Sequence, residues 1–199
     1  RSGGVGANPA RRQPRVHPAL TRMQVGLQVA RSDMVLAYIG LGGNLDSGAI
    51  QPAQTLLQAA SDLDQLPHTR LMQLSPLYRS APIGYDDQPD FINAVALLQT
   101  RLSAIELLRH LQALELQHGR QRSALQRNGP RTLDLDLLLY GQHAEQCIDL
   151  PTLQVPHPRL HQRAFVLRPL ADIAPTLHIP GQGPLSALLP RVSAQVLHP

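Results

Sequence analysis

The chain has 199 residues, of which 43% are hydrophobic, and it carries 18 basic against 14 acidic side chains. This length suffices for one domain with a substantial core, and no apolar run approaches the roughly 20 residues that a membrane span requires. The one cysteine, Cys147, excludes an intramolecular disulfide and fits a reducing compartment, so we expect a cytoplasmic protein.

The positive charge is concentrated at the start of the chain. Residues 1–33 contain six of the arginines and one acidic residue, which leaves twelve arginines and thirteen acidic residues in the remainder. This near-neutral remainder argues against a nucleic-acid-binding face. Residues 1–33 also contain Gly and Pro, follow no clean period and lack the apolar centre of a secretory signal. We therefore expect a disordered N-terminal extension followed by a domain over residues 34–199.

Hydrophobic spacing and turn residues predict alternating strands and helices after residue 33. A glycine cluster at 40–43 and Asn44 are expected to end the first strand, and Ser103 with Glu106 forms a capping box before the second helix. In chain order, the expected elements are a strand at 35–41, a helix at 50–66, a strand at 69–78, a strand at 91–99, a helix at 103–118 and a strand at 131–140.

This βαββαβ order predicts an α+β fold with a ferredoxin-like core, in which helices cover an antiparallel sheet. Pro76 marks an edge or a bulge in the second strand. Prolines at 151, 156 and 158 exclude long elements in the last quarter of the chain, so we expect short additional C-terminal elements, including a helix at 161–170. The complete fold is expected to have three layers, α/β/α.

The last core strand carries two carboxylates at its beginning. Strict alternation would place Leu133, Leu135, Leu137 and Leu139 on one face, and would place Asp134, Asp136, Leu138 and Tyr140 on the other. Neighbouring carboxylates at the mouth of a buried strand repel each other and need a compensating cation. Mg²⁺ that bridges substrate phosphates is one candidate. An ordinary strand whose aspartates face water or Arg131 is the alternative.

Five stretches together resemble 6-hydroxymethyl-7,8-dihydropterin pyrophosphokinase, a family of folate-pathway enzymes. They are AYIGLGGNL, SPLYRSAPIGYDDQPDFINAV, LELQHGRQR, GPRTLDLDLLLYG and VPHPRLHQRAFVLRPL, and they run in order through most of the chain. The resemblance implies that ATP passes its β,γ-pyrophosphoryl unit to the hydroxymethyl oxygen of the pterin and leaves as AMP. It also implies two Mg²⁺ ions that act with ATP, a monomer, and no nucleic-acid or membrane partner.

The resemblance assigns roles to residues of this chain. It makes Asp134 and Asp136 the metal ligands and, with Arg122 and Arg127, the catalytic residues. The predicted ATP-binding residues are Gln112, Glu115, Arg122, Arg127, His157 and Arg163. The predicted pterin-binding residues are Ser80, Ala81, Ile83, Phe91, Asn93 and Phe165, with the two phenylalanines on either side of the flat ring.

Two residues depart from the pattern of the family. Asn128 stands where a Trp follows the loop arginine, and Pro158 stands where a Tyr is common beside the histidine. These changes bear on loop closure and ATP affinity. Two other classes also fit an Asp-x-Asp strand in this fold: a metal-dependent nucleotidyltransferase, which releases pyrophosphate, and a ferredoxin-like binding module without catalytic activity.

Overall fold

The structure, a computed structural model, describes residues 34–82, 87–120 and 129–199. The expected N-terminal extension over residues 1–33 lies outside the described residues. So do four positions singled out above: Ile83, Arg122, Arg127 and Asn128.

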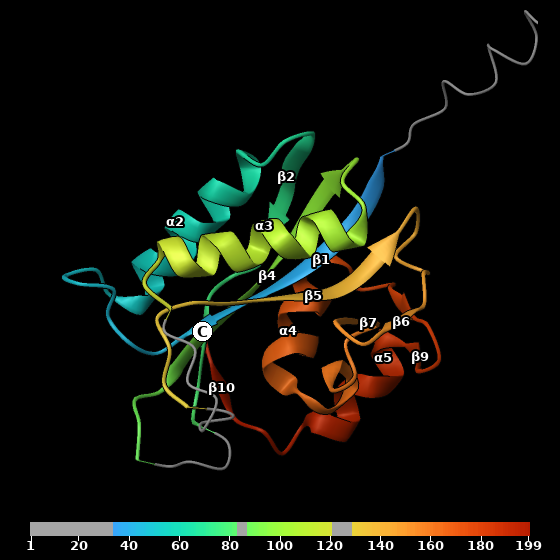
Figure 1. Cartoon of the computed structure of the whole chain (residues 1–199). Coiled ribbons are helices and arrows are strands. Elements are labelled where there is room, and N and C mark those ends of the chain that lie inside the picture. The colour runs from blue at the N-terminus through green and yellow to red at the C-terminus, as the bar shows by residue number, and fades with distance from the viewer. Residues whose placement is uncertain (1–33, 83–86, 121–128) are drawn as a thin grey trace, which may run out of the picture. The chain divides into compact units, whose positions relative to one another are not determined.

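An antiparallel sheet forms the centre of the molecule (Figure 1). Its strands are β1 (Val35–Gly43), β2 (Thr69–Leu74), β3 (Tyr78–Ser80), β4 (Phe91–Thr100), β5 (Asp134–Gly141) and β10 (Leu197–His198). β1 lies between β4 and β5, while β2 and β3 both pair with β4 on its other side and β10 pairs with β3. The strand predicted at 69–78 is therefore two strands, separated around Pro76, whose backbone has no N–H to donate.

Helices cover both faces of this sheet, as Figure 1 shows. α2 (Pro52–Asp64) and α3 (Ala104–Gln117) contribute leucines to one buried cluster. α4 (Ala164–Ile173), α5 (Leu185–Leu188) and the short helix η2 (Leu189–Val192) contribute to a second cluster on the opposite face. The capping box before α3 is confirmed, since Ser103 accepts from the Glu106 N–H and Glu106 accepts from the Ser103 N–H.

The sequence suggested that the glycine cluster ends the first strand, but the structure shows that it does not. β1 continues to Gly43, and the backbone N–H of Asn44 then donates to the carbonyl of Arg131 at 2.9 Å. A Cβ added at Gly43 would lie 2.4 Å from the carbonyl oxygen of Thr132. The glycine therefore permits close approach of two backbones instead of breaking the strand.

The prediction that side chains alternate strictly between the two faces of β5 is also wrong after Leu137. The register against β1 shifts between Tyr38 and Ile39, so β5 has one extra residue there. This β-bulge places Leu138 and Leu139 together in the second core cluster and turns Tyr140 into the first. The expectation that the strand is buried on both sides is confirmed for Leu137–Gly141.

Short elements follow β5. They are β6 (Ile148–Leu150), β7 (Leu153–Val155), η1 (Leu160–Gln162), α4, β8 (His178–Ile179), β9 (Gly183–Pro184), α5, η2 and β10. β6 and β7 form a hairpin, which the sequence analysis did not predict. None of the helices among the described residues is long and apolar enough to cross a membrane.

Candidate active site

Asp134 opens β5 and is held by two arginines. One Nη of Arg131 lies 2.8 Å from Asp134 Oδ2, and one Nη of Arg120 lies 2.5 Å from Asp134 Oδ1. All three side chains are largely buried, with 18–24% of each exposed. Part of the expected compensating positive charge at the carboxylate pair is therefore supplied by the protein itself.

Glu115 anchors this cluster from α3. Its carboxylate accepts from the N–H of Leu135 at 2.8 Å and also pairs with the guanidinium of Arg120. The side chain is buried, with 2% of the residue exposed, so it is not a solvated surface group. Gln112, predicted to share the face of Glu115, lies one turn earlier on α3 and is half-buried. These contacts fix the start of β5 relative to the helix.

Asp136 has a different environment from Asp134. Burial and, to a lesser extent, the nearby charge of Asp134 together raise the pKa of its carboxyl to about 7, against the opposing positive charge of Arg163. Among the described residues, no hydrogen bond or ion pair to this carboxylate is found. The two adjacent aspartates thus differ, since one is paired with arginine and the other is buried with only distant compensation.

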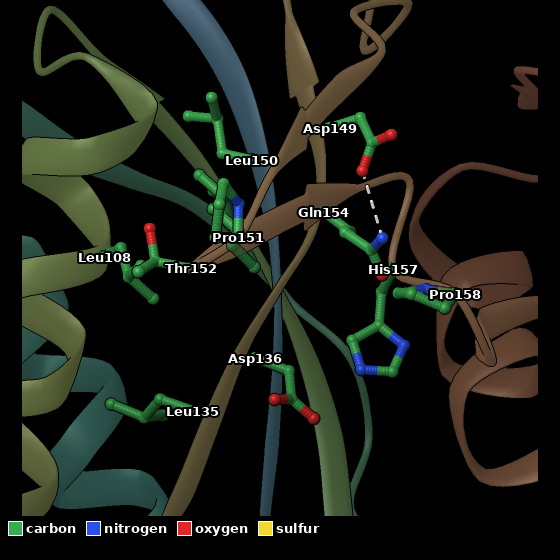
Figure 2. A pocket seen from close by; sticks show the side chains of 12 residues that line it. Leu108, Leu135, Asp136, Asp149, Leu150, Pro151, Thr152, Gln154, His157 and Pro158 are labelled. Carbon is green, nitrogen blue, oxygen red and sulfur yellow. Dashed lines mark hydrogen bonds between the residues drawn. The ribbon is translucent and has the colours of Figure 1, made fainter.

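A pocket of about 670 Å³ lies beside Asp136. Leu108 of α3 and the β6–β7 hairpin border it, and Figure 2 shows the carboxylate of Asp136 and the imidazole of His157 extending into it. Gln154 spans the hairpin by donating to Asp149 at 3.0 Å. Pro158, the second departure from the family pattern, also lines the pocket.

His157 is attached to the bulge of β5. Its backbone N–H donates to the carbonyl of Leu138 at 2.9 Å. Its Nδ1 accepts from the N–H of Arg159 at 3.2 Å, which leaves the ring proton on Nε2. Burial, with the charges of Arg163 and Arg159, lowers the pKa of this imidazole to about 4, so the ring is neutral near pH 7.

Two glycines of β1 lie between the carboxylates and Asn93. Gly42 pairs with Asp134 on one side and with Asn93 on the other, and Gly40 pairs with Asp136. Cross-strand partners share a face of the sheet, so Asn93 and the carboxylate pair lie on the same face. A Cβ at Gly42 would lie 3.3 Å from Asn93 Oδ1, and a Cβ at Gly40 would lie 3.4 Å from the side chain of Leu138. Glycine at position 42 therefore leaves room for the amide of Asn93.

Asn93 and Ser80 form a buried polar pair beside Gly42. Asn93 Nδ2 donates to Ser80 Oγ at 2.9 Å, and both residues are less than 8% exposed. β3 holds Ser80 opposite Phe91 of β4, two residues before Asn93 and hence on the same face. Ala81, the next predicted pterin contact, is exposed just after β3.

Each predicted aromatic residue lies under an arginine. The guanidinium carbon of Arg131 is 5.3 Å from the centre of the Phe91 ring, and that of Arg163 is 5.4 Å from the centre of the Phe165 ring. These are cation–π distances. Arg131 therefore joins the predicted pterin residue Phe91 to the predicted metal ligand Asp134, so these two predicted sites are contiguous.

Three residues of this site were missed as candidates. Arg120 and Arg131 hold Asp134, while Asn44 accepts from the Arg131 N–H at 2.9 Å and donates to the carbonyl of Pro89 at 2.9 Å. A signal for the arginines was available, because two adjacent acids on a buried strand require nearby cations. No local pattern could show that Asn44 connects these distant segments.

The residues brought together define a class of site. A pair of carboxylates and several guanidinium groups gather at the beginning of β5, and Asp136 and the neutral His157 line the pocket beside them, as is typical of enzymes that transfer phosphoryl groups. Sequence comparison identifies the family. The family model of 7,8-dihydro-6-hydroxymethylpterin-pyrophosphokinase matches residues 38–175, and the chain belongs to this family.

Individual relatives agree with this assignment. The chain is 50% identical over 152 residues to the 2-amino-4-hydroxy-6-hydroxymethyldihydropteridine pyrophosphokinase of Pseudomonas aeruginosa. The aligned region covers 76% of this chain and 88% of the relative. The chain is also 43% identical over 156 residues to the enzyme of the same name from Haemophilus influenzae, and that alignment covers 78% of this chain and 92% of the relative.

Solved structures resemble the fold. A Plasmodium falciparum HPPK-DHPS structure has a TM-score of 0.61 at 13% identity and covers 83% of this chain. A second HPPK-DHPS structure, described as a complex with substrates, has a TM-score of 0.56 at 14% identity and covers 78% of this chain. This chain spans 46% and 43% of those chains, and at such identity the likeness concerns the fold alone.

Proposed function

We infer that this chain is an ATP-dependent pyrophosphokinase of folate biosynthesis. It transfers the β,γ-pyrophosphoryl group of ATP to the hydroxymethyl group of 6-hydroxymethyl-7,8-dihydropterin and releases AMP. Membership of the pyrophosphokinase family supports this reaction. The observation that carries it furthest is the carboxylate pair Asp134 and Asp136, which shares a sheet face with Asn93 and of which Asp136 lines a pocket.

We propose that Asp134 and Asp136 hold two Mg²⁺ ions together with ATP. Bound Mg²⁺ would neutralise the charge that develops on the transferred group and on the leaving oxygen of AMP. The donor set fits, because hard carboxylate oxygens suit Mg²⁺ and a buried carboxylate such as Asp136 gains from a cation. Among the described residues, no three His, Cys, Asp or Glu side chains gather to hold an ion. Water and phosphate oxygens would complete the coordination.

The chain's cations suit a polyphosphate near these carboxylates. Arg163 and the neutral His157 lie close enough to the carboxylate pair to affect its charge or to be affected by it. The Nε2–H of His157 can donate to a phosphate oxygen, and guanidinium groups match phosphate in two-point hydrogen bonds. Gln112 and Glu115 remain predicted ATP-binding residues. Arg122 and Arg127 remain predicted catalytic and ATP-binding residues outside the described part of the chain.

The sheet face around Asn93 suits the pterin. The amide of Asn93 offers both a donor and an acceptor to the edge of a heterocycle, and Ser80 keeps it in place. Phe91 and Phe165 are proposed to stack on the ring, with arginines behind both. Ala81 and Ile83 complete the predicted set. In this arrangement the hydroxymethyl oxygen would face the β-phosphorus, and positioning supplies much of the rate enhancement.

Product analysis tests the proposal directly. Purified protein is incubated with ATP, Mg²⁺ and the hydroxymethyl-dihydropterin, and the nucleotide is identified by chromatography. We expect AMP and pterin diphosphate, formed only when the pterin is present. Release of ADP would contradict pyrophosphoryl transfer. Release of inorganic pyrophosphate with the AMP attached to the pterin, and no free AMP, would favour nucleotidyl transfer instead.

The remaining proposals concern the fold, the oligomeric state and the location of the protein. The strand order β5-β1-β4 with β2 and β3 outside supports a ferredoxin-like arrangement for residues 34–199. We also propose a monomeric, cytoplasmic enzyme without a nucleic-acid partner. Light scattering of the purified protein tests the oligomeric state, and fractionation of cells tests the location.

A further inference from the structure

The segment after η2 returns to the substrate side of the sheet. Figure 1 shows this red segment running from the C-terminal helices to β10, next to β3. Along the way it contacts two elements that carry predicted pterin residues. Gln195 binds the beginning of α4, and Leu197 pairs with Ser80 of β3.

Gln195 supplies a cap that α4 lacks locally. The residue at the N-cap position of α4 is Arg163, and its side chain makes no capping hydrogen bond. Gln195 Oε1 instead accepts from the N–H of Ala164, the first residue of the helix, at 2.9 Å. Gln195 Nε2 donates to the carbonyl of Gln162 at 2.8 Å. One amide thus fixes the chain on both sides of Arg163.

The capped turn contains residues of the candidate site. Phe165 follows Ala164 directly, and the guanidinium of Arg163 lies over its ring. Leu197, two residues beyond Gln195, packs against the second core cluster and pairs in register with Ser80. Ser80 in turn accepts from Asn93. The segment 195–197 therefore connects both sides of the predicted pterin site.

We propose that Gln195 is a positioning residue for pterin binding, which acts by holding the first turn of α4 so that Phe165 faces the ring of the substrate. The inference rests on the proposed function. Gln195 is exposed and acts at a distance from the reacting atoms, so its loss should weaken pterin binding without unfolding the protein. Among the predicted nucleotide residues in the described part of the chain, Arg163 lies in the capped turn, whereas Gln112, Glu115 and His157 have no hydrogen bond to Gln195, so nucleotide affinity should fall less than pterin affinity.

Three variants separate these effects. Gln195→Met keeps the length of the side chain and removes both hydrogen bonds. Gln195→Glu keeps an acceptor for the Ala164 N–H, and a negative charge is favourable at a helix N-terminus. Gln182→Met is the matched control, because Gln182 is an exposed glutamine with no side-chain hydrogen bond among the described residues. Dissociation constants of the pterin are measured from its own fluorescence, with Mg²⁺ and α,β-methylene ATP present.

Gln195→Met is expected to raise the pterin dissociation constant by about three- to tenfold, the range that one or two exposed hydrogen bonds provide. Gln195→Glu and Gln182→Met should keep pterin and nucleotide affinity within about twofold of the unmodified protein. In Gln195→Met the nucleotide affinity should fall less than the pterin affinity. Equal pterin affinity of Gln195→Met and Gln182→Met would overturn the proposal. So would equal weakening of pterin and nucleotide binding with a lower melting temperature, which indicates a general structural role.

The proposed function is checked in the same preparation. If the unmodified protein forms no AMP from ATP and the pterin, the proposed function fails whatever the variants do. If it does form AMP while Gln195→Met binds pterin normally, only the role of Gln195 is refuted.

Discussion

Replacing Asp134 or Asp136 by asparagine should change the free energy of unfolding in opposite directions. Both replacements remove a proposed metal ligand and should abolish turnover. In metal-free protein, however, Asp136→Asn should raise the free energy of unfolding, because it removes a buried charge with no close partner. Asp134→Asn should lower it, because Arg120 and Arg131 lose the carboxylate that they share.

The magnitude for Asp136 follows from its pKa, which rises from 3.8 in its ordinary state to about 7 in the folded protein. A raised pKa means that the folded state favours the protonated carboxyl. The stabilisation from the protonated carboxyl is complete below the pKa that Asp136 has in the unfolded state. It is lost as the pH rises through the pKa that Asp136 has in the folded state. Each pH unit in this window costs about 1.4 kcal/mol, so ionising Asp136 costs about 2–4 kcal/mol by pH 8.

Breaking the pairs of Asp134 should cost about 1–3 kcal/mol, since its arginine partners are largely but not completely buried. In a domain of this size, 1 kcal/mol corresponds to about 2–4 °C in melting temperature. We therefore expect Asp136→Asn to melt at least about 4 °C above the unmodified protein at pH 8 without metal. Asp134→Asn should melt at least about 2 °C below it.

Calorimetry from pH 5 to pH 8 measures these effects in the presence of a chelator. The unmodified protein should lose stability relative to Asp136→Asn as the pH rises. The difference between their melting temperatures should therefore narrow toward pH 5. Saturating Mg²⁺ should stabilise the unmodified protein at pH 8 and leave both variants unchanged. Parallel stability curves for the unmodified protein and Asp136→Asn would refute the argument that Asp136 is a penalised buried charge.

Four further outcomes are expected. Asp134→Ala should slow AMP formation by several orders of magnitude with the far-ultraviolet circular dichroism spectrum unchanged, and near-normal turnover would exclude a metal role. Mg²⁺ affinity, measured by calorimetry, should increase up to tenfold for each unit by which the pH is raised toward pH 7, because the metal displaces the proton of Asp136. An affinity that does not depend on pH would contradict this. Glu115→Ala should weaken Mg²⁺ binding more than Glu115→Gln, which still accepts from Leu135, and equal effects would show that this bond is unimportant. Ser103→Ala should cost about 1 kcal/mol in urea unfolding without changing turnover, and no loss would mean that the capping box adds nothing.

Much of the fold was predictable because its signals are local. Helical spacing found α2, and the Ser103–Glu106 box found the beginning of α3. The antiparallel sheet followed from the order of the elements. The β6–β7 hairpin and β10 were not predicted, because strands of two or three residues lack a readable period.

The errors at β1 and β5 share a physical origin. Glycines normally interrupt strands, but here Gly43 lies against the backbone of Thr132, a contact between segments nearly 90 residues apart in sequence. The bulge at Leu138 depends on pairing with β1, which no pattern within β5 reveals. Both features are tertiary, so a single sequence read locally could not show them.

The site was partly predictable. The Asp-x-Asp strand and the resemblance indicated Asp136 and His157, which line the pocket, yet the roles of the candidate residues stay predictions. Arg131 was considered as a partner of the aspartates but Arg120 was not, because local sequence does not show which of several arginines reaches a carboxylate. The different environments of Asp134 and Asp136 likewise depend on packing, which alternating residues of the same type cannot reveal.

The bulge in β5 separates two demands on one strand. Residues before it carry the carboxylates that are proposed to bind metal, while those after it fill two apolar layers, and the extra residue lets Leu138 and Leu139 enter the same layer. Deleting Leu138 would restore regular pairing but would remove one leucine from the second cluster and the carbonyl that holds His157. Selection for catalysis and selection for packing can therefore act on the two halves with little mutual interference.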